Sequence, residues 1–133
     1  MAEADDVMAA GAPLSLVVLS GEEARIHYAL ALAASARAIG RPATLLFTME
    51  AIRALVPGYA PEPDAVRRAQ GVAEREVLLT SCAELGARLI VCEMGLRAIG
   101  LDRAALRVDL SLEVAGIVTL LDATPPGAQL ATL

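Results

Sequence analysis

The sequence predicts an α/β protein: a small, open, mostly parallel sheet of four to five strands flanked by helices, in a flavodoxin-like or Rossmann-like three-layer arrangement. Short uncharged apolar runs alternate with segments of helical periodicity along most of the 133 residues. Such alternation favours parallel strands joined by right-handed crossovers. Hydrophobic residues make up 56% of the chain but aromatic residues only 2%, so alanine and branched aliphatic side chains must pack the helices closely on the sheet.

The first strand and helix give the clearest pattern. Residues 14–20, LSLVVLS, are apolar and uncharged, as expected for a strand buried on both faces. A helix rich in alanine and leucine follows over residues 21–39, and Ser20 with Glu23 fits a capping box at its start. Gly40 is a typical C-terminal stop for this helix.

The middle of the chain repeats the alternation with one interruption. Residues 43–48 predict a second buried strand, and residues 49–55 a short helix. Residues 56–64, VPGYAPEPD, contain three prolines and one glycine and therefore form a long loop. The next helix spans residues 65–85 and has its firmer pattern from Val72 onward.

The last third predicts two more strand–helix units and sets the sheet topology. We expect a flavodoxin-like strand order 2-1-3-4, in which the first and third strands are neighbours and ligands bind outside their carboxyl ends. The predicted elements are a strand at 88–92, a helical turn at 93–99, a short helix capped by Asp102, a strand at 112–116, a helix at 117–124, and an edge strand at 128–133.

The chain length predicts one domain, residues 14–133, preceded by a flexible acidic leader, residues 1–13. The start, MAEADD, lacks the positive charge of a signal peptide. The longest uncharged stretch, residues 7–21, is shorter than the ~20 apolar residues of a membrane span. We therefore expect no membrane contact, a cytoplasmic location and reduced cysteines.

Composition also limits the partners. A net charge of -5 and only three aromatic residues argue against nucleic-acid binding, which needs a basic face or stacking platforms. A mean hydropathy of +0.58 favours a homo-oligomer, because monomers rarely leave large apolar patches exposed. Two cysteines and one histidine, His27, form no metal-ligand pattern, and the absence of phosphate-loop motifs predicts no cofactor.

Cys92 is the candidate reactive group. It ends the third predicted strand, as Ser20 and Gly21 end the first, so the expected strand order places them at one crevice. The helical turn after Cys92 favours a thiolate through its free N–H groups, and Arg97 adds positive charge, whereas Glu93 opposes it. Two interpretations stay open at this stage, a thiol presented for chemistry and a small buried side chain.

Other candidate residues have weaker patterns. Cys82 lies in the middle of a helix among leucines and is interpreted as packing, too far from Cys92 for a disulfide. His27 serves either as a base or, more often for such a position, as a surface or interface histidine. The pair Arg67 and Arg68 either neutralises an anionic ligand or forms solvated surface charge, which is the commoner case.

Four stretches together resemble the DsrE/DsrF-like family of sulfur-relay proteins: LSLVVLSGEEARIHYALALAASARAIG, PATLLFTMEAIRAL, LGARLIVCEMGLRAIGL and LEVAGIVTLLDAT. The third stretch is the most specific, since it holds a cysteine at a strand end followed by a methionine-containing turn. The resemblance implies a small α/β fold and homo- or hetero-oligomers, dimers, trimers or hexamers. It also implies that Cys92 accepts sulfane sulfur as a persulfide from a donor protein and passes it to an acceptor.

The sequence departs from the family pattern near the expected crevice. Met49-Glu50-Ala51 replaces an aromatic–glycine pair, and Gly95 stands where serine is common. The proline-rich loop is a candidate cover for the sulfur.

The alternatives to sulfur relay are a small-ligand-binding module without covalent chemistry and a structural subunit with an inert cysteine. The residues expected to line the crevice beside Cys92 are Ser20, Gly21, Thr48, Met94, Gly95 and Arg97.

Overall fold

The computed structural model describes residues 11–133, so most of the predicted leader lies outside the described residues. Five parallel strands form one sheet in the order β4-β3-β2-β1-β5. The strands are β1 (Leu14–Val18), β2 (Ala43–Phe47), β3 (Arg88–Cys92), β4 (Leu112–Ala115) and β5 (Gln129–Thr132). The helices are α2 (Glu23–Ala38), η1 (Met49–Leu55), α3 (Pro63–Ala69), α4 (Arg75–Glu84), α5 (Glu93–Ala98), η2 (Arg103–Ala105) and α6 (Ile117–Asp122), of which η1 and η2 are 3₁₀ helices.

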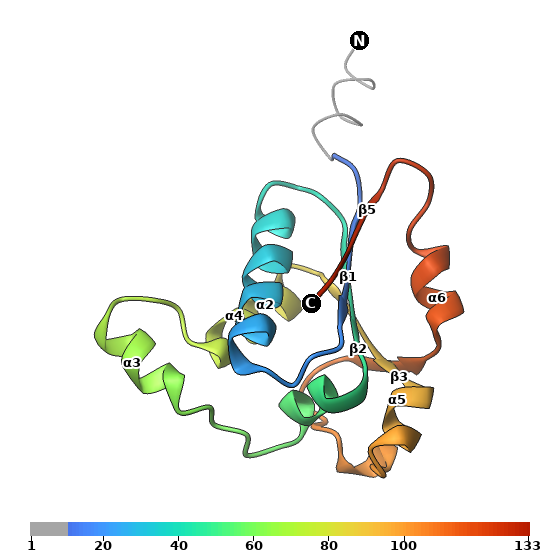
Figure 1. Cartoon of the computed structure of the whole chain (residues 1–133). Helices are drawn as coiled ribbons and strands as arrows, with labels where there is room; N and C mark the ends of the chain where they lie inside the picture. The colour runs from blue at the N-terminus through green and yellow to red at the C-terminus, as the bar shows by residue number, and fades with distance from the viewer. Residues whose placement is uncertain (1–10) are drawn as a thin grey trace.

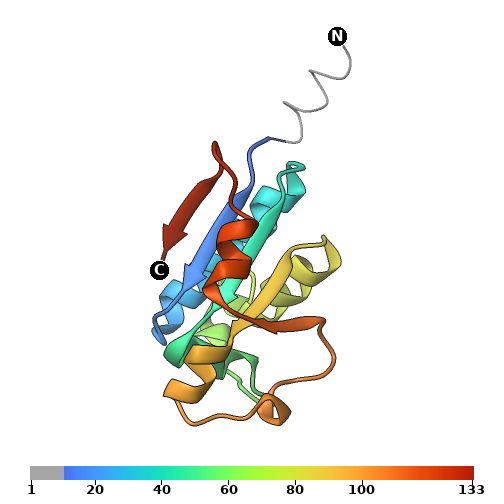
Figure 2. The ribbon, with the colours of Figure 1, turned by 90° about the vertical axis from the view of Figure 1, so that its right-hand side faces the viewer.

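The elements stack in three layers and confirm the predicted α/β class. Figure 1 shows α2 and α4 on one side of the sheet and α6 on the other. In Figure 2, α6 lies in front of the strands, while α5 and η1 gather at the end where β2 and β3 finish. The carboxyl ends of the strands therefore meet the starts of α2, η1 and α5 at one edge.

The predicted strand order 2-1-3-4 is wrong. β2 lies between β1 and β3, with Val18 opposite Phe47 and Phe47 opposite Val91. Each successive crossover moves outward in one direction until α6 carries the chain back across the sheet to β5, beside β1. Apolar strand composition did not distinguish the two orders, because the first three strands are all apolar, although β2 would be an edge strand in the predicted order and is the central strand here.

Most predicted element positions are confirmed, with two local differences. The Ser20 hydroxyl accepts a hydrogen bond from the N–H of Glu22 rather than capping α2, which begins at Glu23 without a side-chain cap. The predicted helix at 65–85 is split into α3 and α4, since Gly71 adopts a positive φ of 72° in the turn between them. Asp102 caps η2 through the N–H of Ala104, as expected.

Two apolar cores lie on the two faces of the sheet. In the larger core, buried side chains of α2, α4 and η1 pack against buried strand residues such as Leu45 and Phe47. The smaller core consists of Leu46, Ile90 and Cys92 beneath Leu120 of α6. Within residues 11–133, no helix has the length and apolar character to cross a membrane.

Candidate functional site

The carboxyl edge of the sheet brings the turns after β1, β2 and β3 together, and β2 supplies the middle turn. Thr48 follows β2, is buried, and donates its N–H to the Val18 carbonyl at 3.0 Å. Ser20 follows β1 and donates its N–H to the Leu133 carbonyl at 3.1 Å. The predicted crevice between the first and third strands is therefore occupied by the end of β2.

Two glycines allow these turns to approach each other closely. A Cβ on Gly95 would lie 2.5 Å from the Thr48 hydroxyl and 2.7 Å from the Met49 nitrogen. A Cβ on Gly21 would lie 2.9 Å from the Cβ of Glu50. Gly95 thus packs α5 directly on the turn after β2, and a serine at this position would force that turn to move.

Met49 carries backbone strain at the centre of this edge. Its φ is 50°, and it is the only described non-glycine residue with a positive φ. For an unbranched side chain this conformation is uncommon and persists only where the surroundings enforce it. Thr48 and Gly95 supply that enforcement. In the sequence, only the departure from the family pattern at Met49 marked this position, and it did not indicate the conformation.

Cys92 lies at the junction of β3 and α5, as predicted, and is the N-cap residue of α5. Its side chain belongs to the smaller core and is 1% exposed. It contacts aliphatic side chains there and does not belong to the contact between the turns that hold Gly21 and Glu50. α5 spans only six residues, so its dipole is small. Within the described chain, no hydrogen bond to the Cys92 sulfur is present; the one sulfur donor is Cys82.

The proline-rich loop does not cover Cys92, and the predicted site residues Met94 and Arg97 do not point toward its sulfur. α6 covers Cys92 through Leu120, whereas the proline-rich loop lies by α3 and α4, away from this sulfur. Met94, 54% exposed, and Arg97 both project from α5 to solvent. The structure therefore brings Gly21, Thr48 and Gly95 together but separates them from the Cys92 side chain.

Cys82 is a packing residue, as predicted. It lies on the buried face of α4, against α2, and donates its S–H to the Leu30 carbonyl at 3.3 Å. Burial raises the pKa of the Cys82 thiol to about 11, despite a lowering contribution from the Ala34 backbone. Both cysteines are free, and they lie in different cores on opposite faces of the sheet. At neutral pH, Cys82 is therefore protonated and unreactive.

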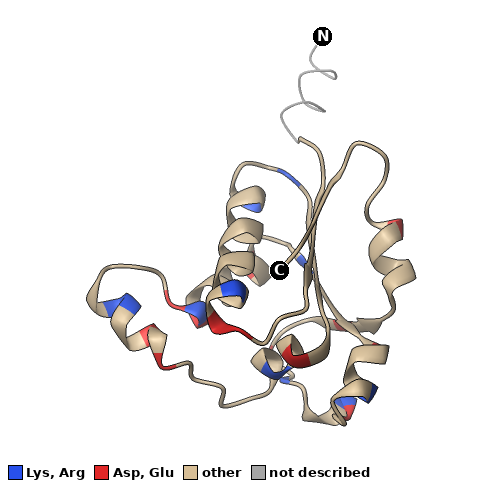
Figure 3. Ribbon diagram, in the orientation of Figure 1, with Lys and Arg blue, Asp and Glu red and all other residues tan. Residues whose placement is uncertain are grey.

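Charged residues gather around α3, the start of α4 and the start of α2 (Figure 3). Arg67 binds Glu23 at 2.6 Å and Asp64 at 2.9 Å, so it joins α3 to the start of α2. Arg68 pairs with Glu74. Both arginines therefore pair with carboxylates of this chain. His27 contacts the Ala73 carbonyl at 2.9 Å and attaches the α3–α4 turn to α2.

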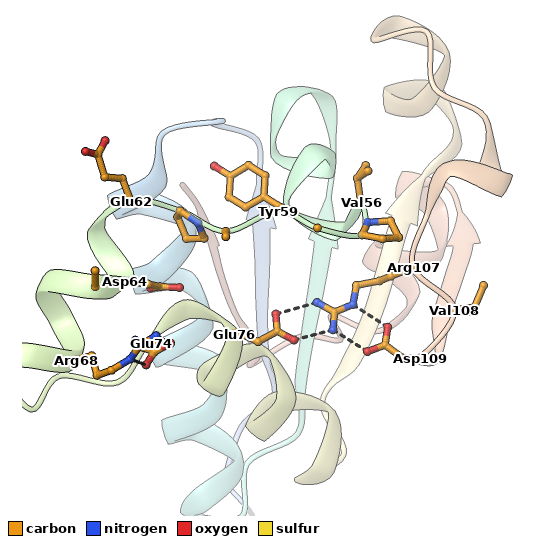
Figure 4. Close-up of a pocket in the computed structure, with 15 residues that line it drawn as sticks. Val56, Tyr59, Glu62, Asp64, Arg68, Glu74, Glu76, Arg107, Val108 and Asp109 are labelled. Carbon is orange, nitrogen blue, oxygen red and sulfur yellow. Dashed lines mark hydrogen bonds and ion pairs between the residues drawn. The ribbon is translucent and has the colours of Figure 1, made fainter.

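A pocket that the sequence did not indicate lies between the proline-rich loop, α3, the start of α4 and the segment at 107–109. Its volume is about 770 Å³. Figure 4 shows Arg107 between Glu76 and Asp109, and the hydrogen bonds that Arg107 donates to the carboxylates of Asp109 and Glu76 raise its pKa. The five acidic groups outnumber the two arginines in the lining. None of the residues expected beside Cys92 belongs to it, although the candidate Arg68 does: the charged lining residues are Glu62, Asp64, Arg68, Glu74, Glu76, Arg107 and Asp109.

Arg75 is buried behind this pocket. Its guanidinium lies 3.9 Å from the centre of the Tyr59 ring, and its Nη1 has no hydrogen-bond partner within the described residues. Burial lowers the pKa of Arg75, and this is partly offset by electrostatic interactions with Tyr59 and with the carboxylates of Glu23 and Asp64. Stacking on Tyr59 therefore holds the proline-rich loop against α4. Across residues 11–133, no group of three histidine, cysteine or carboxylate side chains is placed to bind a metal ion.

Comparison with known proteins decides the family. The model of the DsrE/DsrF-like family matches residues 15–130. The chain belongs to the DsrE/DsrF-like family. This match confirms the resemblance carried by the cysteine stretch, and the family is associated with sulfur relay. No curated protein matches the sequence significantly.

A solved structure supports the same fold for this family member. The protein of unknown function MTH1491 from Methanobacterium thermoautotrophicum superposes with a TM-score of 0.61 at 14% sequence identity. The alignment covers 92% of this chain and 99% of that one. At this identity the likeness concerns the fold alone.

Proposed function

We propose that the protein is a sulfur carrier that accepts sulfane sulfur on Cys92 as a persulfide and passes it to an acceptor protein. The observation that carries the proposal is the place of Cys92 at the β3–α5 junction, in the stretch whose sequence resembles the family's cysteine motif and inside the residues that the family model matches. The other cysteine supports the assignment by exclusion, because its S–H is donated to the Leu30 carbonyl inside the α2–α4 core and the pKa of the Cys82 thiol is raised there.

The proposed transfer is a thiol–persulfide exchange without net oxidation. The Cys92 thiolate attacks the terminal sulfur of a donor persulfide, a new S–S bond forms on Cys92, and the donor's S–S bond breaks. The donor leaves as a thiolate and the terminal sulfur stays with Cys92. The reverse attack by an acceptor thiolate then releases the sulfur, so neither a metal nor a cofactor enters the balance.

Transfer requires that α6 moves away from the sulfur. Leu120 is the only buried residue of this six-residue helix, and Gly116 precedes it in an extended conformation. Few buried contacts imply a low local free energy of opening. In the closed position, α6 would shield the persulfide from water and peroxide, which otherwise oxidise it.

The partners in this proposal are a sulfur donor and a sulfur acceptor, and the protein itself forms a homo-oligomer. Met94 and Arg97 are exposed beside the β3–α5 junction and would contact such a partner. A cytoplasmic location would keep the Cys92 thiol reduced between transfers.

Mass spectrometry after incubation with a low-molecular-weight persulfide tests the proposal. We expect an adduct of about 32 Da, one sulfur atom, on the wild-type protein and on Cys82→Ser, because exchange takes place on Cys92. The Cys92→Ser variant should show no adduct. An adduct lost only in Cys82→Ser would contradict the assignment.

A second candidate is a structural subunit with an inert cysteine. The 1% exposure of Cys92 within an aliphatic core favours it. Under this alternative, wild type forms no adduct, and Cys92→Ala changes only stability. The same experiment therefore separates the two functions.

A further inference from the structure

The two edges of the sheet differ in their protection. β4 carries Glu113, which pairs with Arg88 of β3 at 2.7 Å, and charges on an edge strand discourage pairing with another chain. On β5, all four residues, Gln129–Thr132, are exposed, and residues 123–133 contain no charge. Figure 3 shows this part of the ribbon without charged residues. β5 is thus an unprotected edge.

The outer side of β5 offers a defined set of hydrogen-bonding groups. Its inner side is bonded to β1, with the N–H of Gln129 donating to Pro13 and that of Leu133 donating to Val17. Backbone groups of a strand alternate between its two sides. The N–H and C=O groups of Leu130 and Thr132 therefore point away from the sheet.

Exposed apolar side chains lie on both sides of this edge. Leu130 points to the α6 face, because it pairs with Ser15 of that face, and it is half exposed. α6 adds a stripe in which Val118 is 80% exposed. α2 adds a stripe on the other face. The exposed apolar side chains of the two helices are Ile117, Val118 and Leu121 of α6, and Tyr28, Leu32 and Ile39 of α2.

The α2 stripe faces the β5 side of the molecule. α2 packs on α4 through Leu30, whose carbonyl accepts the Cys82 S–H. Leu32 is two residues further, about 200° around the helix at about 100° per residue, and so lies on the side opposite α4. Since α4 lies toward β3, this side is directed toward β5.

We propose that β5 is a self-association edge: β5 of one copy pairs antiparallel with β5 of a second copy about a twofold axis at Ala131. Leu130 of each chain then exchanges two hydrogen bonds with Thr132 of the other, and the two Ala131 residues face each other. The two five-stranded sheets become one continuous sheet.

A second copy fits this surface better than a charged partner. The chain has a net charge of -5, so two copies repel except where they meet through surface without acidic side chains; residues 123–133 have no charged side chain, and the charged group bound to β5 is the Arg41 guanidinium on the Gln129 side chain. The groups on the edge are also self-complementary under a twofold rotation, as an isologous contact requires. Pairing of four strand residues alone buries less than the roughly 800 Å² of surface per partner that a stable interface needs. The exposed apolar side chains of α2 and α6 supply the remaining area.

The inference rests on the homo-oligomer of the proposed function and adds its surface and symmetry. It does not depend on the chemistry of Cys92. Persulfide formation and edge pairing can therefore fail separately.

Charge reversal at the axis tests the pairing. Ala131 is exposed in the single chain, so Ala131→Lys and Ala131→Glu should fold normally, but each places two like charges directly opposite one another. We expect each variant to weaken the contact at least about tenfold and to show half the wild-type molar mass by light scattering. An equimolar mixture of the two variants should recover the wild-type mass. Ala69→Lys, on the exposed surface of α3, is the matched control and should keep the wild-type mass.

Three outcomes would overturn the proposal. A wild-type protein that is monomeric at high concentration rejects self-association altogether. An oligomer whose mass is unchanged in Ala131→Lys places the interface elsewhere and leaves the homo-oligomer intact. Variants that dissociate but do not recover on mixing reject the twofold axis at Ala131.

Discussion

The two faces of the sheet are built from the same kind of aliphatic strand residues but are covered very differently. On one face, α2 and α4 bury Leu30, Phe47 and Cys82 within a continuous core, and Arg67 fastens α3 to α2. On the other, α6 inserts one buried side chain, Leu120. Each face holds one cysteine, so the difference in cover decides what each thiol can do: one is fixed, and the other lies beneath a short helix.

The largest expected effect is the loss of Phe47, the only phenylalanine, from the thickly covered face. Phe47→Ala removes a fully buried ring from the end of β2, the central strand of the sheet, and leaves a cavity. We expect the free energy of unfolding to fall by about 3–5 kcal/mol. Urea titration followed by circular dichroism measures the change. A loss no larger than that of Leu120→Ala would contradict the greater contribution of the face covered by α2 and α4.

A smaller effect with a different consequence is expected on the thinly covered face. Leu120→Ala should lower the free energy of unfolding by about 2 kcal/mol, the low end for a buried leucine, because α6 can collapse toward the sheet. Native-state labelling with a maleimide should then become faster at Cys92 while Cys82 stays unlabelled.

The labelling experiment has its own control. Leu79 is buried beside Cys82 in α4, so Leu79→Ala disturbs the other cysteine by a matched substitution. Faster labelling of Cys92 in Leu79→Ala than in Leu120→Ala would show that global unfolding, rather than movement of α6, exposes the sulfur.

The smallest loss of unfolding free energy is expected when one carboxylate on either face of the sheet is neutralised. Asp64 is buried and accepts hydrogen bonds from the Arg75 N–H and from Arg67. We expect Asp64→Asn to cost about 1–2 kcal/mol, since a charged hydrogen bond is lost in a sheltered place. Glu113→Gln breaks the more exposed pair with Arg88 on the other face and should cost less than about 1 kcal/mol.

The same carboxylate predicts a pH dependence. Burial alone would raise the pKa of Asp64, but the hydrogen bonds from Arg75 and Arg67 and their charges bring it below its ordinary value of 3.8. A folded-state pKa below the unfolded value stabilises the protein above the unfolded pKa, and this stabilisation is lost as the pH falls through the folded one. The stability difference between wild type and Asp64→Asn should therefore shrink below about pH 4. A constant difference down to pH 2 would contradict this cause.

The sequence determined the α/β class, the positions of the strands and the identity of both cysteines, because hydrophobic period and turn residues are local properties. Gly40, for example, follows the first helix with a positive φ of 83°, as its position predicted. It also determined that Cys92 ends a strand and precedes a helical turn. These features need no knowledge of which strands are neighbours.

Only the tertiary structure decided the strand order, the conformation of Met49, the close approach of Gly95 to Thr48, and the direction in which Cys92 points. Each depends on contacts between segments far apart in the chain. A strand end lies at the same edge in either order, but its neighbour changes when β2 rather than β1 adjoins β3. Cys92 faces α6 because side chains alternate along β3 and because the return crossover to β5 places that helix there.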